Sequence, residues 1–259
     1  MDFETLLFDK EDGLGIITLN RPKSLNGLND VLLRELSQLM DLIAGDEEIK
    51  AVILTGGKKV FAAGGDIAYI ASLDAVGAAS FVALAQDAMD KIDRLGKPVI
   101  AAVCGLALGG GCELALAADI RLAADGAVFG LPEINLGIIP GAGGTQRLTR
   151  AVGPGWAKYL VYTGDSIDGD LALKIGLING LFPQEQLMEE ARKLAKKLAA
   201  KAPLALKAAK SCINFGIGVD LASGLQYEQK TWALLFATQD QKEGFNAFLE
   251  KRKAKFTGR

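Results

Sequence analysis

Two glutamates in apolar surroundings are the side chains best suited to chemistry. Glu113 precedes the apolar run 114–117, and Glu133 follows Leu131 and Pro132. An isolated glutamate is usually exposed. A carboxylate in the first turn of so apolar a helix would instead point into the core or a pocket, where burial raises its pKa toward neutrality. Two such acids can act as proton donor and proton acceptor, although spacing alone does not decide between this role and a structural one.

Two glycine loops can provide backbone donors for the same site. Gly109, Gly110 and Gly111 immediately precede a predicted helix, so its first N–H groups can approach a ligand closely, with the positive end of the helix dipole behind them. Gly64 and Gly65 can add an N–H group from a different loop. Such donors suit a developing oxyanion, whereas any single glycine pair is more often a tight turn. Together, the loops and the two acids favour a site.

The composition excludes other kinds of active site. The 259 residues include no histidine, which rules out Ser-His-Asp and Cys-His nucleophiles and any His-ligated metal. The glycine loops match neither GxGxxG nor GxxxxGK[ST], the patterns of nucleotide-binding loops. A net charge of −2 argues against nucleic acid or an anionic membrane as the main partner.

The cysteines and the apolar runs indicate the cellular compartment of the protein. The three cysteines form no CxxC motif, so we expect reduced thiols in a cytoplasmic protein. The longest uncharged apolar run, 98–112, is too short and too rich in glycine to span a membrane. We therefore expect a core segment there.

The pattern of elements is mixed α/β in the first two thirds and nearly all helical from about Gly153 onward. Strands are expected in pairs before each helix, which is not the alternation of a doubly wound sheet. The apolar spacing predicts strands at 6–8, 16–19, 51–54, 99–103 and 119–122, and helices after Asn29 and at 75–95, 112–118 and 185–200.

Distinctive segments occur at 20–26, 61–67, 107–115, 129–133 and 137–148. Together they resemble the enoyl-CoA hydratase/isomerase (crotonase) family, and the likeness continues to 248–253. This resemblance implies an α/β fold, a crotonase-like spiral of ββα turns. Its core, with the active site, would be residues 1–195, and residues 196–259 would be a C-terminal helical region that builds trimers, usually paired into hexamers.

The resemblance also implies a site and a reaction. Two backbone N–H groups of the family, which match Gly65 and Gly110, hold the thioester carbonyl of an acyl-CoA. The two glutamates of its hydratases match Glu113 and Glu133. Retention of both implies reversible syn addition of water to a trans-2-enoyl-CoA, with Glu113 activating the water and Glu133 protonating C2. No metal or separate cofactor is implied, because CoA is part of the substrate.

Other positions match family residues that meet the substrate. Asp66, Ile67 and Ala68 follow Gly65, and many family members have lysine where this chain has Ala68, which puts a phosphate contact in doubt. The residues that match contacts to the nucleotide end of CoA are Lys23 and, from a neighbouring protomer, Phe248 and Lys251.

Three alternatives stay open. The first is another acyl-CoA reaction within the same fold, such as enoyl-CoA isomerisation. The second is a non-catalytic relative that binds RNA, which the net charge of −2 disfavours. The third is an inactive trimeric scaffold, which the presence of both Glu113 and Glu133 disfavours.

Overall fold

Two sheets carry the fold of the computed structural model, which describes residues 3–259. The first two strands form an antiparallel hairpin closed by Asp12 and Gly13, both with positive φ, and the other pairs of the larger sheet are parallel. Within the described residues, the larger sheet has the order β1 (Leu6–Glu11), β2 (Leu14–Leu19), β3 (Ala51–Thr55), β4 (Val99–Val103), β6 (Ile120–Ala124) and β9 (Gly180–Phe182). The smaller sheet has the order β5 (Leu106–Leu108), β7 (Val128–Gly130) and β8 (Ser166–Asp168).

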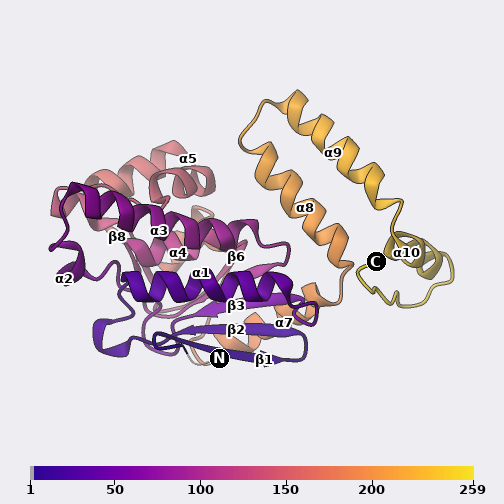
Figure 1. Ribbon diagram of the computed structural model, residues 1–259, viewed down its shortest axis with the longest axis horizontal. Helices are drawn as coiled ribbons and strands as arrows, with labels where there is room; N and C mark the ends of the chain where they lie inside the picture. Colours follow the sequence, from indigo (N-terminus) through magenta and orange to yellow (C-terminus); the bar gives the residue numbers. More distant parts are fainter. Residues whose placement is uncertain (1–2) are drawn as a thin grey trace.

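Helices cover both faces of the larger sheet (Figure 1). The helices are α1 (Asp30–Gly45), α2 (Ile67–Ile70), α3 (Ala75–Arg94), α4 (Gly110–Ala117), α5 (Gly144–Thr163), α6 (Gly169–Lys174), α7 (Leu187–Ala199), α8 (Pro203–Gly216), α9 (Leu221–Leu235) and α10 (Gln239–Leu249), with short 3₁₀ helices η1 (Pro22–Ser24) and η2 (Pro132–Leu136). None of the helices in the described part of the chain is both long enough and apolar enough to cross a bilayer.

The central strands β3 and β4 are apolar throughout because both of their faces are buried. Alternate side chains point to opposite faces of a strand. Val52 and Leu54 accordingly pack into the core beneath α1, α3 and α4, whereas Ala51 and Ile53 pack into the core beneath α7. The helices α1, α3 and α4 therefore form one layer on the same face of the larger sheet.

Local signals in the sequence correctly predict most of these elements. Asn29 caps α1, since its Oδ1 accepts a hydrogen bond from the Leu32 N–H at 3.0 Å. The mixed α/β class with a helical C-terminal part is confirmed. The chain after Gly153 is mostly helical, as expected, but two strands were missed: β8 adds to the smaller sheet and β9 to the larger one. Each has three residues, too few to show a period of two.

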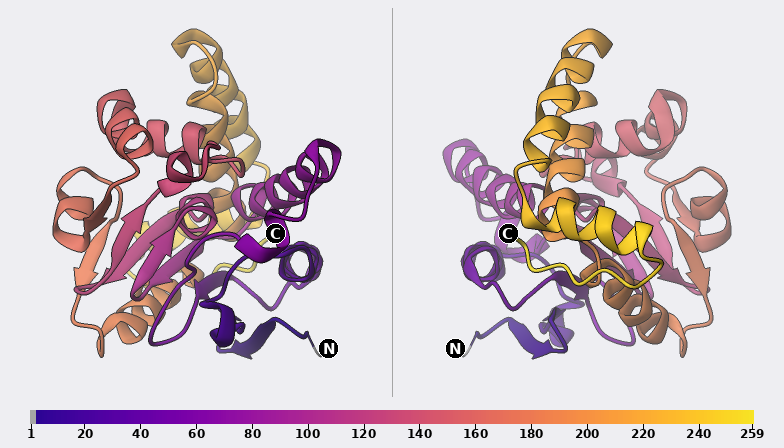
Figure 2. Two further views of the ribbon diagram at one scale, coloured as in Figure 1. Left: turned by 90° about the vertical axis from the view of Figure 1, so that its left-hand side faces the viewer. Right: turned by 90° about the vertical axis from the view of Figure 1, so that its right-hand side faces the viewer.

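The C-terminal helices stand apart from the sheets. Both views of Figure 2 show α8 and α9 projecting beyond the body of the protein. α8 is tied to the body by Lys210, whose Nζ lies 2.9 Å from Asp119 Oδ2. The expected boundary at residue 195 falls inside α7, which packs on the larger sheet, and the division into two domains stays a prediction.

Candidate active site

The turn from β5 into α4 places the first group of the site. Gly109 has φ 50° and ψ −123°, a conformation that needs glycine, and it directs the chain straight into α4. A Cβ atom on Gly109 would also lie 3.0 Å from Glu133 Oε1, so the absence of a side chain leaves room for that carboxyl group. The helix therefore begins at Gly110, two residues earlier than expected.

Two backbone N–H groups, those of Gly65 and Gly110, lie near this turn. Leu28 bonds to Gly64 O and to the Asp66 N–H, so the N–H of Gly65, between them, points away from Leu28. A Cβ atom on Gly110 would lie 3.6 Å from the Gly65 nitrogen. Neither the Gly65 nor the Gly110 N–H donates a hydrogen bond to any residue from 3 to 259. Unpaired N–H groups of this kind are able to donate to an oxygen atom of a bound ligand.

Glu113 is buried in the first turn of α4, with 3% of its surface exposed. Its Oε1 accepts the N–H groups of Ala142 at 2.8 Å and Gly144 at 2.7 Å. Burial raises the pKa of Glu113, while these two hydrogen bonds and the charge of Arg147 oppose the rise. Both bonds go to Oε1, which leaves the lone pairs of Oε2 outside this pair of hydrogen bonds.

Glu133 is the second residue of η2, and Pro132 begins that helix. Its Oε2 is buried and has no hydrogen-bond partner in the part of the chain that the structure describes. Burial raises the pKa of Glu133 to about 7, and the nearby charge of Glu113 adds to the rise. A carboxyl group with this pKa is about half protonated at pH 7, so it can donate a proton at neutral pH.

One cavity of about 1300 Å³ joins all four groups. Its walls are mostly apolar, as in many small-molecule sites. They come from α1, from α2 and α3, and from the segment after η2. Among the residues that line it are Leu28, Ile70, Phe81, Val82, Ala85, Ile138 and Ile139. No group of three or more His, Cys, Asp or Glu side chains within residues 3–259 is placed to hold a metal ion.

The residues that follow Gly65 have different surroundings. Ile67 lines the cavity. The Asp66 carboxylate caps α2 and lies 3.0 Å from Arg21 Nη2, and this hydrogen-bonded guanidinium holds the pKa of Asp66 below its ordinary value. Ala68 is exposed on α2, and Lys23 is exposed on η1, next to Arg21. The structure therefore gives Asp66 a role in shaping the loop.

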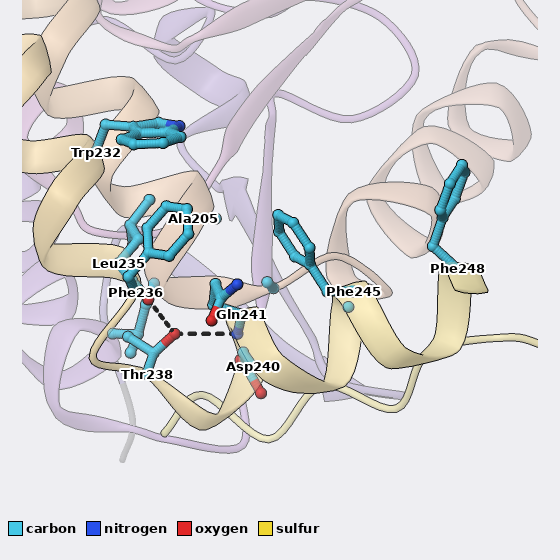
Figure 3. A pocket seen from close by; sticks show the side chains of 12 residues that line it. Ala205, Trp232, Leu235, Phe236, Thr238, Asp240, Gln241, Phe245 and Phe248 are labelled. Atoms are coloured by element: carbon cyan, nitrogen blue, oxygen red, sulfur yellow. Dashed lines mark hydrogen bonds between the residues drawn. The ribbon is translucent and has the colours of Figure 1, made fainter. Parts of the chain in front are cut away.

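Phe248 and Lys251 do not reach this cavity within the same chain. They lie at and just beyond the C-terminal end of α10, at the opposite end of the molecule from α2 (Figure 1). Phe248 lines a separate apolar cavity of about 530 Å³ between α8, α9 and α10, together with Trp232, Phe236 and Phe245 (Figure 3).

Sequence reasoning missed the two amides that hold Glu113. Ala142 and Gly144 lie in the segment 137–148, which carried the family resemblance but no assigned role. A Cβ atom on Gly144 would lie 2.9 Å from Glu113 Oε1, which explains the glycine at this position. The signal in the sequence is the pair Gly143-Gly144 at the start of a helix, and only the fold shows which side chain the turn contacts.

The comparisons with known proteins agree with this arrangement. A family model described as enoyl-CoA hydratase/isomerase matches residues 9–259. A crotonyl-CoA hydratase of Syntrophomonas wolfei is 47% identical over 257 residues, 99% of each chain. A short-chain-enoyl-CoA hydratase of Clostridium acetobutylicum is 44% identical over 254 residues, 98% of this chain and 97% of the relative.

A solved structure confirms the expected fold. The crystal structure of an enoyl-CoA hydratase from Bacillus anthracis has a TM-score of 0.95 and 41% identity, and the match covers 99% of this chain and 100% of that one. With the family model spanning residues 9–259, the chain belongs to the enoyl-CoA hydratase/isomerase family.

Proposed function

We propose that this protein is an enoyl-CoA hydratase, which adds water reversibly to a trans-2-enoyl-CoA to give the 3-hydroxyacyl-CoA. The observation that carries the proposal is that Glu113 and Glu133 line the same cavity as the free N–H groups of Gly65 and Gly110. Relatives named crotonyl-CoA hydratase and short-chain-enoyl-CoA hydratase, at 47% and 44% identity, support the substrate class.

The two N–H groups handle the charge of the reaction. Water attacks C3 of a conjugated thioester only if negative charge can move to the carbonyl oxygen. The N–H groups of Gly65 and Gly110 would bind that oxygen more strongly as its charge develops. Removal of one such donor typically raises the barrier by about 3–4 kcal/mol.

The two carboxyl groups handle the protons. Ionised Glu113, whose Oε2 is left free by the Ala142 and Gly144 amides, would orient the water and take its proton. Protonated Glu133, with its pKa raised to about 7 by burial, would deliver a proton to C2. Dehydration reverses both roles. Because both groups act from one side of the substrate, the addition would be syn. CoA is part of the substrate, and no separate cofactor enters this scheme.

The assembly we propose is a trimer or a dimer of trimers. No residue of α8 or α9 is buried against the rest of residues 3–259. The large apolar side chains of Leu221, Trp232 and Leu234 are exposed. Exposed apolar faces of this extent mark interaction sites. A neighbouring protomer would bring Phe248 and Lys251 to the CoA, near Lys23. Light scattering on purified protein would show three or six copies, and a monomer would contradict the assembly.

The location we propose is the cytoplasm. Cys104 and Cys112 are buried and Cys212 is half-buried, and all three are free thiols, in keeping with a reducing compartment. Cell fractionation would test this, and recovery outside the cytoplasm would contradict it.

The function is tested with crotonyl-CoA. Purified protein is expected to lower the absorbance of the conjugated enoyl-thioester of crotonyl-CoA to an equilibrium value. Starting from 3-hydroxybutyryl-CoA, the absorbance is expected to rise to the same equilibrium. An unchanged crotonyl-CoA signal would contradict hydration. Conversion of a 3-enoyl-CoA in the same preparation would then indicate an isomerase.

A further inference from the structure

One face of α3 holds the turn that carries the two amides bound to Glu113. Val82, Gln86 and Asp90 recur at intervals of four residues and so share a helix face. Gln86 Nε2 donates a hydrogen bond to Gly141 O at 2.7 Å. Val82 Cγ2 lies 3.0 Å from the position of a Cβ atom on Gly141, so the helix packs directly against the turn.

Arg147 joins the same helix face to the turn. Its Nη2 donates to Asp90 Oδ1 at 2.7 Å, and its Nη1 donates to Ala142 O at 3.1 Å. A Cβ atom on Gly143 would overlap Nη1, so the guanidinium packs against bare backbone. The Arg147 side chain is 18% exposed, which limits the water that competes for these bonds.

Ala142 is therefore held on both sides. Its carbonyl accepts a hydrogen bond from Arg147, and its N–H donates to Glu113 Oε1. The Gly144 N–H, which bonds to the same oxygen, lies two residues further along the turn. A displaced guanidinium would release the Ala142 carbonyl, in the turn whose amides hold the carboxylate.

We propose that Arg147, anchored by Asp90 on α3, is a positioning residue that fixes the orientation and the ionised state of Glu113. This inference rests on the proposed function, because it takes Glu113 as the base that activates water. Arg147 touches neither substrate nor water in this scheme and acts through the Ala142–Gly144 turn and through its charge.

The charged and titratable groups around Glu113 determine the sign of the effect. Arg147, from α5, opposes the rise in the pKa of Glu113. Glu133, from η2, is the nearby acid, and Cys112, from α4, is a neutral thiol because burial raises its pKa to about 12. Asp90, from α3, is hydrogen-bonded to Arg147 and affects Glu113 through that residue. Loss of the Arg147 charge therefore raises the pKa of Glu113, and the ionised base is lost at a higher pH.

The main test is Arg147→Gln in the full-length protein with crotonyl-CoA. We expect kcat to fall by about tenfold or more, since a misplacement of about 1 Å can cost a hundredfold. KM should change by less than about twofold, because Arg147 itself does not line the cavity. The acidic limb of the kcat–pH profile should move to higher pH. Arg147→Lys, which keeps the charge, should return the limb to its wild-type position and recover part of kcat.

Two further variants connect the effect to the α3 anchor and to Glu113. Asp90→Asn should lower kcat in the same direction, since it frees the guanidinium. Combining Arg147→Gln with Glu113→Gln should give a rate within about twofold of Glu113→Gln alone, because coupled residues are not additive. The matched controls are Arg94→Gln, which breaks the other ion pair of Asp90, and Arg150→Gln, one turn along α5 on the exposed surface.

Two outcomes would overturn the inference while leaving the proposed function intact. The first is that the wild type is active and the Arg147→Gln variant has the same kcat and the same pH profile. The other is a lower kcat that comes with a lower Tm but no movement of the acidic limb, as expected of a merely structural contact. A wild type that fails to hydrate crotonyl-CoA would instead overturn the proposed function, and this inference with it.

Discussion

Replacing Glu133 by glutamine is expected to lower kcat for crotonyl-CoA hydration by about 10²–10⁴-fold, the usual contribution of a general acid. Glutamine keeps the size of the side chain but cannot deliver a proton to C2. KM should change little, because the cavity keeps its shape and the Gly65 and Gly110 donors are untouched. Initial rates from the loss of enoyl-thioester absorbance measure both constants. A Glu133→Gln variant as fast as the wild type would remove this residue from the mechanism.

The pH profile tests the same role independently. Hydration needs protonated Glu133, and burial raises its pKa to about 7. The wild-type kcat should therefore decline as the pH rises above about 7. The residual activity of Glu133→Gln should lack this decline, because its amide does not titrate in that range. A wild-type rate that stays constant to pH 9 would contradict the assignment.

The stability of the same variant provides the control for folding. The pKa of Glu133 rises from its ordinary 4.5 to about 7 in the folded protein, so the folded state holds a proton that the unfolded state has released. Wild-type stability attributable to this group therefore falls as the pH rises through that interval. Glu133→Gln avoids the penalty. Its Tm should exceed that of the wild type by about 2 °C or more at pH 8 and match it at pH 5.

Glu113→Gln is the second substitution with a large expected effect. The amide oxygen of glutamine can still accept the Ala142 and Gly144 N–H groups, so the turn keeps its structure. An amide cannot take a proton from water, and kcat should fall by about 10²–10⁴-fold. The matched control is Glu185→Gln, the same change at an exposed position, which should keep the wild-type rate.

Two measurements separate a chemical loss from a structural one in Glu113→Gln. KM for crotonyl-CoA should stay within about twofold of the wild type, since a base used only in the transition state contributes little to ground-state binding. The Tm should not fall, because the variant no longer buries a charge. A large rise in KM with an unchanged kcat would show that Glu113 binds substrate rather than activating water.

Local signals made much of the fold predictable. Asn29 marks the start of α1, Asp12 and Gly13 mark the first hairpin, and the apolar runs of β3 and β4 mark strands buried on both faces. These features depend on neighbouring residues alone. The three-residue strands β8 and β9 could not be predicted in this way, because their pairing partners lie far along the chain.

Residue types and their neighbours were enough to identify the candidate chemical groups: with no histidine, two glutamates in apolar surroundings were the candidate acids, and two glycine loops were the candidate donors. Which groups come together, and in what surroundings, depends on the folded chain. The amides that hold Glu113 are 29 and 31 residues away from it. Every residue except proline carries the same N–H group, so the glycines at 143 and 144 indicate a turn but not which side chain its amides bind. The raised pKa of Glu133 likewise comes from desolvation, which depends on all the atoms that surround the carboxyl group in the folded chain.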